Sequence, residues 1–224
     1  MIINIAIDGP AGAGKSTIAK RVAKELSLIY VDTGAMYRAM AYYLIRREIL
    51  PEDADGIAEA CRDADITICY RDGEQRVVLN GEDITPYLRT EAVGNMASRS
   101  SVHPEVRKKL VELQQKLAAT QAVVMDGRDI GTVVLPDAKV KIYLTASTAT
   151  RALRRCRELE EKGEKPSFEK IEADIIERDN RDMNREISPL KKAEDAVLVD
   201  SSDMTVEEVI DAILTVYREK AESC

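Results

Sequence analysis

The residues whose spacing says most about chemistry form a glycine-rich stretch near the amino end. The stretch matches the phosphate-binding pattern G-x-x-x-x-G-K-[ST] in full and reads Gly9, Pro10, Ala11, Gly12, Ala13, Gly14, Lys15, Ser16 and Thr17. Glycine has no Cβ, so such a backbone can turn its N–H groups inward around a phosphate chain. In this pattern the lysine reaches the β- and γ-phosphates of a nucleotide, and the hydroxyl after it holds Mg²⁺.

The residues on either side give the pattern its context. An apolar run of strand length at 2–8 precedes it, and apolar residues at helical spacing follow over 18–26. The sequence therefore predicts a strand, a tight turn and a helix whose N-terminal N–H groups and dipole favour an anion. A chance glycine-rich turn is the alternative, and the full match between a strand and a helix argues against it.

The rest of the chain alternates apolar strands with helices. Further strands are expected at 28–31, 121–126, 140–144 and 196–200. This order predicts an α/β protein with a parallel sheet and right-handed crossovers. Ligands bind beyond the carboxyl ends of such strands, so Asp8 and Gly9, the loop at 32–35 and residues 126–129 should converge on one crevice.

A small antiparallel insert is predicted at about 63–85. Residues 66–70 and 76–80 read as a hairpin with a glycine-containing turn, and Ile84 could start a third short strand. Helices are expected on both sides of the insert, through Met36 to Leu44, at 57–61, at about 90–100 and from Pro104 to about 119.

Arginines recur at helical spacing in the last third of the chain. A predicted helix between 147 and 162 carries Arg151, Arg154 and Arg155, and a second helix places Arg178, Arg181, Asp182 and Arg185 on one face. A solvated, salt-bridged surface is one interpretation. Together with a phosphate-binding loop, an arginine-rich lid over about 151–185 is the other, since it would offset phosphate charge and exclude water.

Composition limits the remaining classes of function. A chain of 224 residues with 45% hydrophobic residues fits one sizeable domain, 1–224. The net charge of −7 argues against a nucleic-acid or membrane-surface binder, and we expect a monomer without either partner. Cysteines at 61, 69, 156 and 224 form no C-x-x-C pair, which predicts reduced thiols and a cytoplasmic location. The single histidine, His103, precedes Pro104 and is interpreted as a helix-entry residue.

Together these motifs resemble the bacterial cytidylate kinases, nucleoside-monophosphate kinases of the P-loop class. The resemblance spans almost the whole chain and is carried by Ile7–Thr17, by Asp-Thr-Gly-Ala-Met-Tyr-Arg at 32–38, by Met-Asp-Gly-Arg-Asp-Ile-Gly-Thr at 125–132, and by the helix at 178–185. It implies a three-layer α/β fold with a five-stranded parallel sheet, the antiparallel insert and a helical lid. The core would comprise 1–32, 120–150 and 186–224, and the monophosphate-binding region 33–119.

The resemblance also implies an activity and a set of site residues. The γ-phosphoryl group of ATP would pass to CMP or dCMP in the presence of Mg²⁺, giving the diphosphate and ADP. The acceptor phosphate would meet Tyr37, Arg38, Arg128 and Arg185, the sugar hydroxyls Asp182 and Arg178, and the cytosine Ser98, Arg107 and Asp129. Thr33 keeps the hydroxyl of the serine found in some relatives.

Elementary chemistry agrees with these roles. An aspartate acceptor beside an arginine donor matches the edge of cytosine, whereas uracil O4 would oppose Asp129 with a second acceptor. The nucleophile is an ionised phosphate, so catalysis should rest on alignment and charge from Lys15, Arg128, Arg154 and Arg185. Asp126 is the candidate acid beside Ser16 at the metal, and Asp8 or Asp32 could share that task.

Two other functions stay open. A P-loop kinase for a non-nucleotide metabolite would keep the fold, but a base-reading set of residues would then have no purpose. A nucleotide-dependent switch is the second, although the guanine-reading tetrapeptide N-K-x-D of GTPases does not occur in the sequence.

Overall fold

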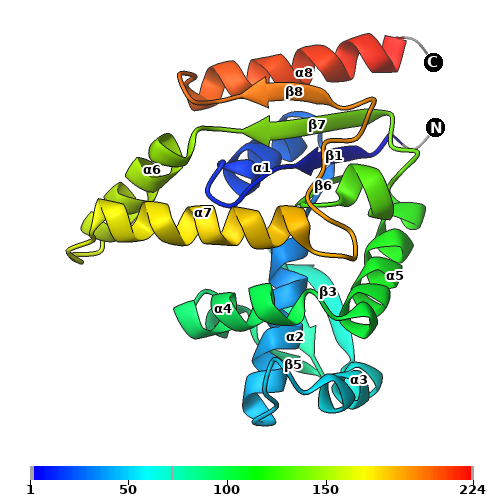
Figure 1. Cartoon of the computed structure of the whole chain (residues 1–224). Helices are drawn as coiled ribbons and strands as arrows, with labels where there is room; N and C mark the ends of the chain where they lie inside the picture. Colours follow the sequence, from blue (N-terminus) through cyan, green and yellow to red (C-terminus); the bar gives the residue numbers. More distant parts are fainter. Residues whose placement is uncertain (1–2, 72, 223–224) are drawn as a thin grey trace. The chain divides into compact units, whose positions relative to one another are not determined.

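The computed structural model describes residues 3–71 and 73–222, which form two compact units (Figure 1). The first unit is Met1–Tyr30 with Gln121–Cys224, and the second is Val31–Thr120. The second unit covers the region at 33–119 that was assigned to monophosphate binding from the sequence. That assignment stays a prediction.

A five-stranded sheet carries the glycine-rich loop. Its order is β2-β6-β1-β7-β8, and the strands are β1 Ile5–Asp8, β2 Ile29–Asp32, β6 Val123–Gly127, β7 Val140–Thr145 and β8 Val197–Asp200. β1 pairs in parallel with β6 and β7, so Asp8 lies opposite both Gly127 and Tyr143. Parallel pairing therefore brings three strand ends to one edge of the sheet, and the predicted five-stranded sheet is confirmed.

Two helices of the first unit cover the sheet with apolar side chains. α1, Lys15–Glu25, packs against β6 and against α8, Val206–Glu222, which lies beside β8 in Figure 1. Buried apolar side chains from the two helices and from the strands pack in one cluster. The cluster includes Ile5, Ile7, Ile18, Val22, Ile142, Leu144, Ile210 and Ile213.

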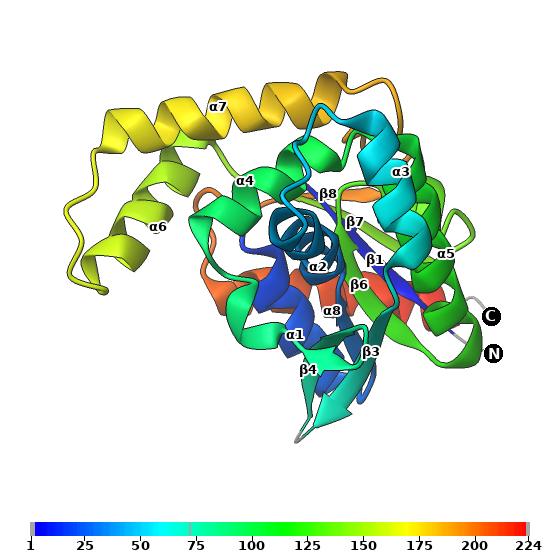
Figure 2. The same ribbon diagram turned by 90° about the horizontal axis from the view of Figure 1, so that it is seen from below.

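The arginine-bearing helices of the first unit form a hairpin. α6 spans Thr148–Glu160 and α7 spans Phe168–Asn184, and the two lie side by side (Figure 2). Ser147 and Ser167 cap them by accepting hydrogen bonds from the amides of Thr150 and Lys170. A π-helical turn, η2, spans Ile130–Val134 and follows β6.

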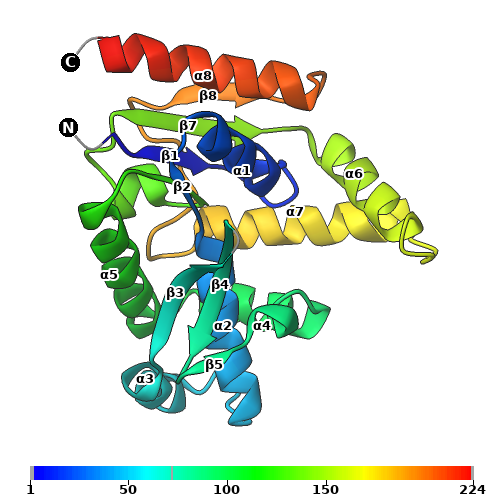
Figure 3. The ribbon, with the colours of Figure 1, turned by 180° about the vertical axis from the view of Figure 1, so that it is seen from behind.

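The described residues of the second unit, 31–71 and 73–120, form four α-helices and the insert. The helices are α2 Thr33–Arg46, α3 Ala54–Asp63, α4 Glu91–Ser100 and α5 Pro104–Thr120, with a 3₁₀ turn, η1, at Thr85–Tyr87. The insert is an antiparallel sheet of β3 Ile66–Arg71, β4 Glu74–Leu79 and β5 Glu82–Asp83, which packs beside α2 (Figure 3). The predicted antiparallel insert is thus confirmed.

Three local expectations differ from the structure. Residues 32–35 are not a loop, because Asp32 caps α2 directly by accepting from the amide of Ala35. The third strand of the insert ends at Asp83, since Ile84 is fully buried and its carbonyl accepts from Tyr87 to begin η1. The first strand starts at Ile5 rather than at residue 2, which lies outside the described residues.

Hydropathy adds one further finding. Over residues 3–71 and 73–222, no helix combines the length and the apolar character that a bilayer crossing requires.

The junction of β1 with the glycine-rich loop leaves no room for a side chain. A Cβ placed on Gly9, where φ is +152°, would lie 1.9 Å from the carbonyl oxygen of Leu144 on β7. We expect Gly9→Ala to lower the free energy of unfolding by about 3 kcal/mol, as overpacking against backbone does. Urea denaturation followed by circular dichroism measures it.

Gly73→Ala is the matched control. Gly73 also has a positive φ, +76°, but a Cβ there would meet nothing within 4 Å. Gly73→Ala should therefore lower the free energy of unfolding only by the backbone strain, about 1 kcal/mol. If both variants lost the same amount of unfolding free energy, the close contact with the Leu144 carbonyl would not explain the effect of Gly9→Ala.

Candidate active site

The glycine-rich loop has the backbone geometry of an anion site. Gly9, Gly12 and Gly14 all have positive φ, and Gly14 is the N-cap of α1 without any side-chain cap. The helix therefore starts directly at Lys15, and its dipole and first N–H groups point toward the loop. The predicted strand, turn and helix are all present.

Lys15 lies folded back over this loop. Its ammonium donates to the carbonyl of Pro10 at 2.7 Å, and the residue is only 6% exposed. Burial lowers the pKa of Lys15 well below its usual value, and the charges of Arg128 and Arg178 lower it further against the opposing effect of Asp126 and Asp8. The phosphates of a bound nucleotide would supply negative charge that favours the ammonium form.

The predicted metal pair is brought together. Ser16 on the first turn of α1 donates to Oδ2 of Asp126 at 2.9 Å, and Tyr30 donates to Oδ1 of the same carboxylate at 2.8 Å. Asp126 ends the strand next to β1, and a hydroxyl beside a carboxylate is a donor set that suits Mg²⁺. Sequence reasoning missed Tyr30, whose contact follows only from the neighbouring positions of β2 and β6.

Asp8 and Asp32, the alternative acids for the metal, are engaged by other groups. Asp8 accepts from the amides of Ile130 and Gly131 at 2.8 and 2.7 Å, and thereby braces the turn after β6. Asp32 caps α2 and also pairs with Arg89. These contacts favour Asp126 as the acid nearest a metal.

Two ion pairs in the first unit join predicted site residues. Arg128 donates from Nε to Asp182 at 2.9 Å, and Nη2 of Arg185 lies 3.9 Å from Asp129. Both carboxylates are at least 94% buried. Burial alone would raise the pKa of Asp182, but Arg128, Arg178 and Arg185 together bring it below its usual value. Arg185 follows the end of α7, so it does not continue the helical face predicted for it.

Two neighbouring residues of α7 divide between the two interpretations of that helix. Arg181 pairs with Glu177 on the surface, as a solvated helix would. Asp182 is buried and bonded to Arg128, as a ligand-directed face would be.

Arg151 on α6 contacts the glycine-rich loop. It is 4% exposed and donates to the carbonyl of Ala11 at 2.9 Å, to Asp179 of α7 at 2.6 Å and to the carbonyl of Ala146 at 2.9 Å. Sequence reasoning placed Arg154 in the catalytic set instead. Arg154 donates to Ser201, to its carbonyl at 2.7 Å and its hydroxyl at 3.2 Å. The arginine spacing alone did not show which side chain faces the loop.

The second unit groups another part of the predicted set. The guanidinium of Arg107 lies over the ring of Tyr37 at 5.5 Å and donates to the carbonyl of Ser101 at 3.2 Å. Ser101 in turn donates to the carbonyl of Ser98 at 2.9 Å, which links the two predicted cytosine readers of this unit. Thr33 and Arg38 lie on the first turns of α2. The other predicted substrate residues belong to the first unit.

The single histidine contacts the backbone near the start of a helix. A ring nitrogen of His103 lies 2.8 Å from the carbonyl of Pro51, just before α5 begins.

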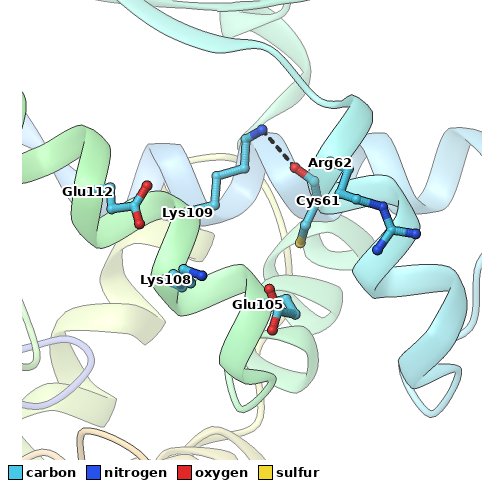
Figure 4. Close-up of a pocket in the computed structure, with 6 residues that line it drawn as sticks. All are labelled: Cys61, Arg62, Glu105, Lys108, Lys109 and Glu112. Carbon is cyan, nitrogen blue, oxygen red and sulfur yellow. Dashed lines mark hydrogen bonds between the residues drawn. The ribbon is translucent and has the colours of Figure 1, made fainter.

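A surface hollow of about 200 Å³ between α3 and α5 is lined by Cys61, Arg62, Glu105, Lys108, Lys109 and Glu112 (Figure 4). There Lys109 donates to the carbonyl of Cys61 and so satisfies the end of α3. Burial raises the pKa of the Cys61 thiol to about 11, which makes it a poor nucleophile.

A strand, a glycine-rich loop and a helix on a parallel sheet define the P-loop class of nucleotide-binding folds. A solved shikimate kinase from Bacteroides thetaiotaomicron shares this fold, with a TM-score of 0.50 and 12% sequence identity over 97% of this chain and 99% of that one.

Sequence comparison is more specific. The family model for cytidylate kinase matches residues 5–219. A cytidylate kinase of Carboxydothermus hydrogenoformans is 50% identical over 97% of this chain and 98% of its own length, and one of Caldicellulosiruptor saccharolyticus is 49% identical over 96% and 95%. The chain belongs to the cytidylate kinase family and is therefore a nucleoside-monophosphate kinase, a phosphotransferase. The family match does not favour a non-nucleotide acceptor or a switch.

The pKa of Asp8 predicts a pH dependence of stability. Burial, aided by the charge of Asp129, raises this pKa from 3.8 to about 6 despite the hydrogen bonds from Gly131 and Ile130. Between about pH 4 and 6 the folded state binds more protons than the unfolded state. The contribution of Asp8 to the free energy of unfolding therefore falls as pH rises from about 4 to 6, by up to about 3 kcal/mol. Asp8→Asn should remove it.

The measurement is the slope of unfolding free energy against pH in urea titrations from pH 4.5 to 7. Relative to the wild type, Asp8→Asn should gain stability with rising pH across this window. The exposed Asp137 provides a control, Asp137→Asn, that should keep the wild-type slope. Parallel profiles for all three proteins would contradict the prediction.

Proposed function

We propose that this protein transfers the γ-phosphoryl group of ATP to CMP or dCMP, giving ADP and CDP or dCDP. The observation that carries the proposal is the gathering of Lys15, Ser16 and Asp126 at the start of α1, in a chain that matches the cytidylate kinase model over 5–219. This gathering supports the proposal, because a lysine, a hydroxyl and a carboxylate at a helix N-terminus would stabilise a polyphosphate and its metal.

The chain's own groups account for most of the chemistry. Backbone N–H groups of Gly9–Thr17 and Lys15 would hold the donor phosphates, while Arg151 fixes the loop through the carbonyl of Ala11. Ser16 and Asp126 fit Mg²⁺, which when bound neutralises charge on the phosphate oxygens. An ionised acceptor phosphate is already a nucleophile, so alignment and positive charge suffice.

We assign the acceptor roles as follows. Arg128 and Arg185, with Tyr37 and Arg38, bind the monophosphate, and Arg178 and Asp182 bind the sugar. Ser98, Arg107 and Asp129 read the base. The Arg128–Asp182 and Arg185–Asp129 pairs support these roles, because each arginine is held by a buried carboxylate and is thereby oriented before a nucleotide arrives.

The protein is proposed to act in the cytoplasm as a monomer. The three described cysteines, Cys61, Cys69 and Cys156, are free thiols, which agrees with a reducing compartment.

A substrate panel tests the function and the base readers together. ADP release in a coupled assay should be fastest with CMP and dCMP and slower with UMP, AMP and dTMP. Asp129→Asn should narrow the gap between CMP and UMP, because an amide can donate to uracil O4. A wild-type enzyme that did not prefer CMP or dCMP would overturn the function, and an unchanged gap in Asp129→Asn would overturn the base reader.

The arginines at the end of α7 provide a matched pair of variants. Arg185→Ala should reduce kcat by about 100-fold or more, since the variant loses a positive charge proposed to contact the accepting phosphate. Arg181→Ala removes an arginine of the same segment whose partner is the surface residue Glu177, and should keep kcat within about twofold. Circular dichroism confirms that both fold. Similar kinetics for the two variants would show that Arg185 has only a structural role.

A further inference from the structure

Gln75 of the antiparallel insert bonds in both directions with the backbone of Asp32. Its Oε1 accepts from the Asp32 amide at 2.8 Å, and its Nε2 donates to the Asp32 carbonyl at 3.2 Å. An amide side chain offers an acceptor and a donor side by side without any change of protonation. The side chain thus attaches β4 to the last residue of β2.

The carboxylate of Asp32 extends this attachment to a helix. Oδ1 accepts from the amide of Ala35 at 2.9 Å and caps α2, and Oδ2 accepts from Arg89 at 2.7 Å. Gln75 lies on the insert and Arg89 follows it closely in the chain. Each backbone and side-chain polar group of Asp32 therefore has a hydrogen-bond partner, and beyond α2 these partners include Gln75 on the insert and Arg89 in the segment after it.

The first turns of α2 carry residues assigned to the acceptor monophosphate. Thr33 directly follows Asp32, and Tyr37 and Arg38 lie one turn later. A Cβ on Gly34 would come within 3.2 Å of Oδ1 of Asp32 and 3.3 Å of Nη1 of Arg38, so the Arg38 guanidinium and the cap lie over the same turn. A displacement of Asp32 would therefore also displace Thr33 and Arg38.

We propose that Gln75 is a positioning residue for the acceptor nucleotide, an inference that rests on the proposed function. It contacts the Asp32 backbone and acts through Asp32 and the first turn of α2. The insert thereby gains a role in the reaction: it fixes the backbone from which Thr33, Tyr37 and Arg38 project. Loss of this attachment should weaken binding of the acceptor and leave binding of the donor nucleotide unchanged.

Two variants of Gln75 and one neighbour test the proposal. Gln75→Ala removes both hydrogen bonds, whereas the isosteric Gln75→Glu keeps the acceptor but opposes the Asp32 carbonyl with a carboxylate. Glu74→Gln, on the same strand, alters an exposed side chain that pairs with Arg76 and serves as the control. Steady-state kinetics with CMP and with ATP varied separately, melting temperature, and amide hydrogen exchange at Ala35 are measured for each.

The proposal expects a split between the two substrates. Both Gln75 variants should raise the KM for CMP by about tenfold, keep the KM for ATP within about twofold, and speed exchange at Ala35. Glu74→Gln should match the wild type. A lower melting temperature with an unchanged KM for CMP would overturn the proposal, because the contact would then only stabilise the fold. If Gln75→Ala does not fold, Gln75→Glu decides by the same criteria.

Failure of the proposed function gives a different result. In that case the wild-type protein itself shows no preference for CMP or dCMP in the substrate panel. Failure of the Gln75 proposal leaves the wild-type preference intact and leaves the KM for CMP of both Gln75 variants at the wild-type value, whatever happens to their melting temperature or Ala35 exchange.

Discussion

The parallel pairing of β1 with both β6 and β7 is the constraint on which the candidate active site depends. It places Asp8 opposite Gly127 and Tyr143, so the loops that leave these strands begin at one edge of the sheet. Gly9 then passes so close to the Leu144 carbonyl that only glycine fits. The loop continues into α1 without a side-chain cap, which leaves the start of that helix available to an anion. An apolar cluster of side chains from the strands, α1 and α8 packs β1 against α1.

Buried charge is the second organising feature, and its cost is met by pairing. Arg151 and Asp179, Arg128 and Asp182, and Arg185 and Asp129 are each paired within the first unit. A buried charge without a partner would cost several kcal/mol, so these pairs offset the cost of burial and orient the arginines. Lys15 differs from these arginines, because burial and the charges of neighbouring arginines lower its pKa. An anionic ligand of the kind we propose would supply negative charge beside Lys15.

Much of the first unit could be predicted from sequence because its signals are local. A glycine pattern, an apolar run before it and helical spacing after it are read within 25 residues or so, and the strands and helices after it follow the same periodic rules. The Ser16–Asp126 pair was also predicted, from the rule that strand ends converge. The missed contacts join residues far apart in the chain. Tyr30 with Asp126, Arg151 with Ala11 and Gln75 with Asp32 depend on strand order and side-chain direction, which no local pattern encodes.

The sequence by itself therefore determined the chemistry available: a loop with the phosphate-binding pattern, a hydroxyl and a carboxylate that we propose hold a metal, and a surplus of arginines in the last third of the chain. It did so because residue type and short-range spacing fix what a segment can bind. Only the tertiary structure decided which arginine does what. Arg151 faces the loop and Arg154 contacts Ser201, while Arg181 pairs at the surface and Arg185 leaves the helix toward Asp129. The physical reason is that burial and ion pairing select among chemically identical side chains, and both depend on packing between distant segments.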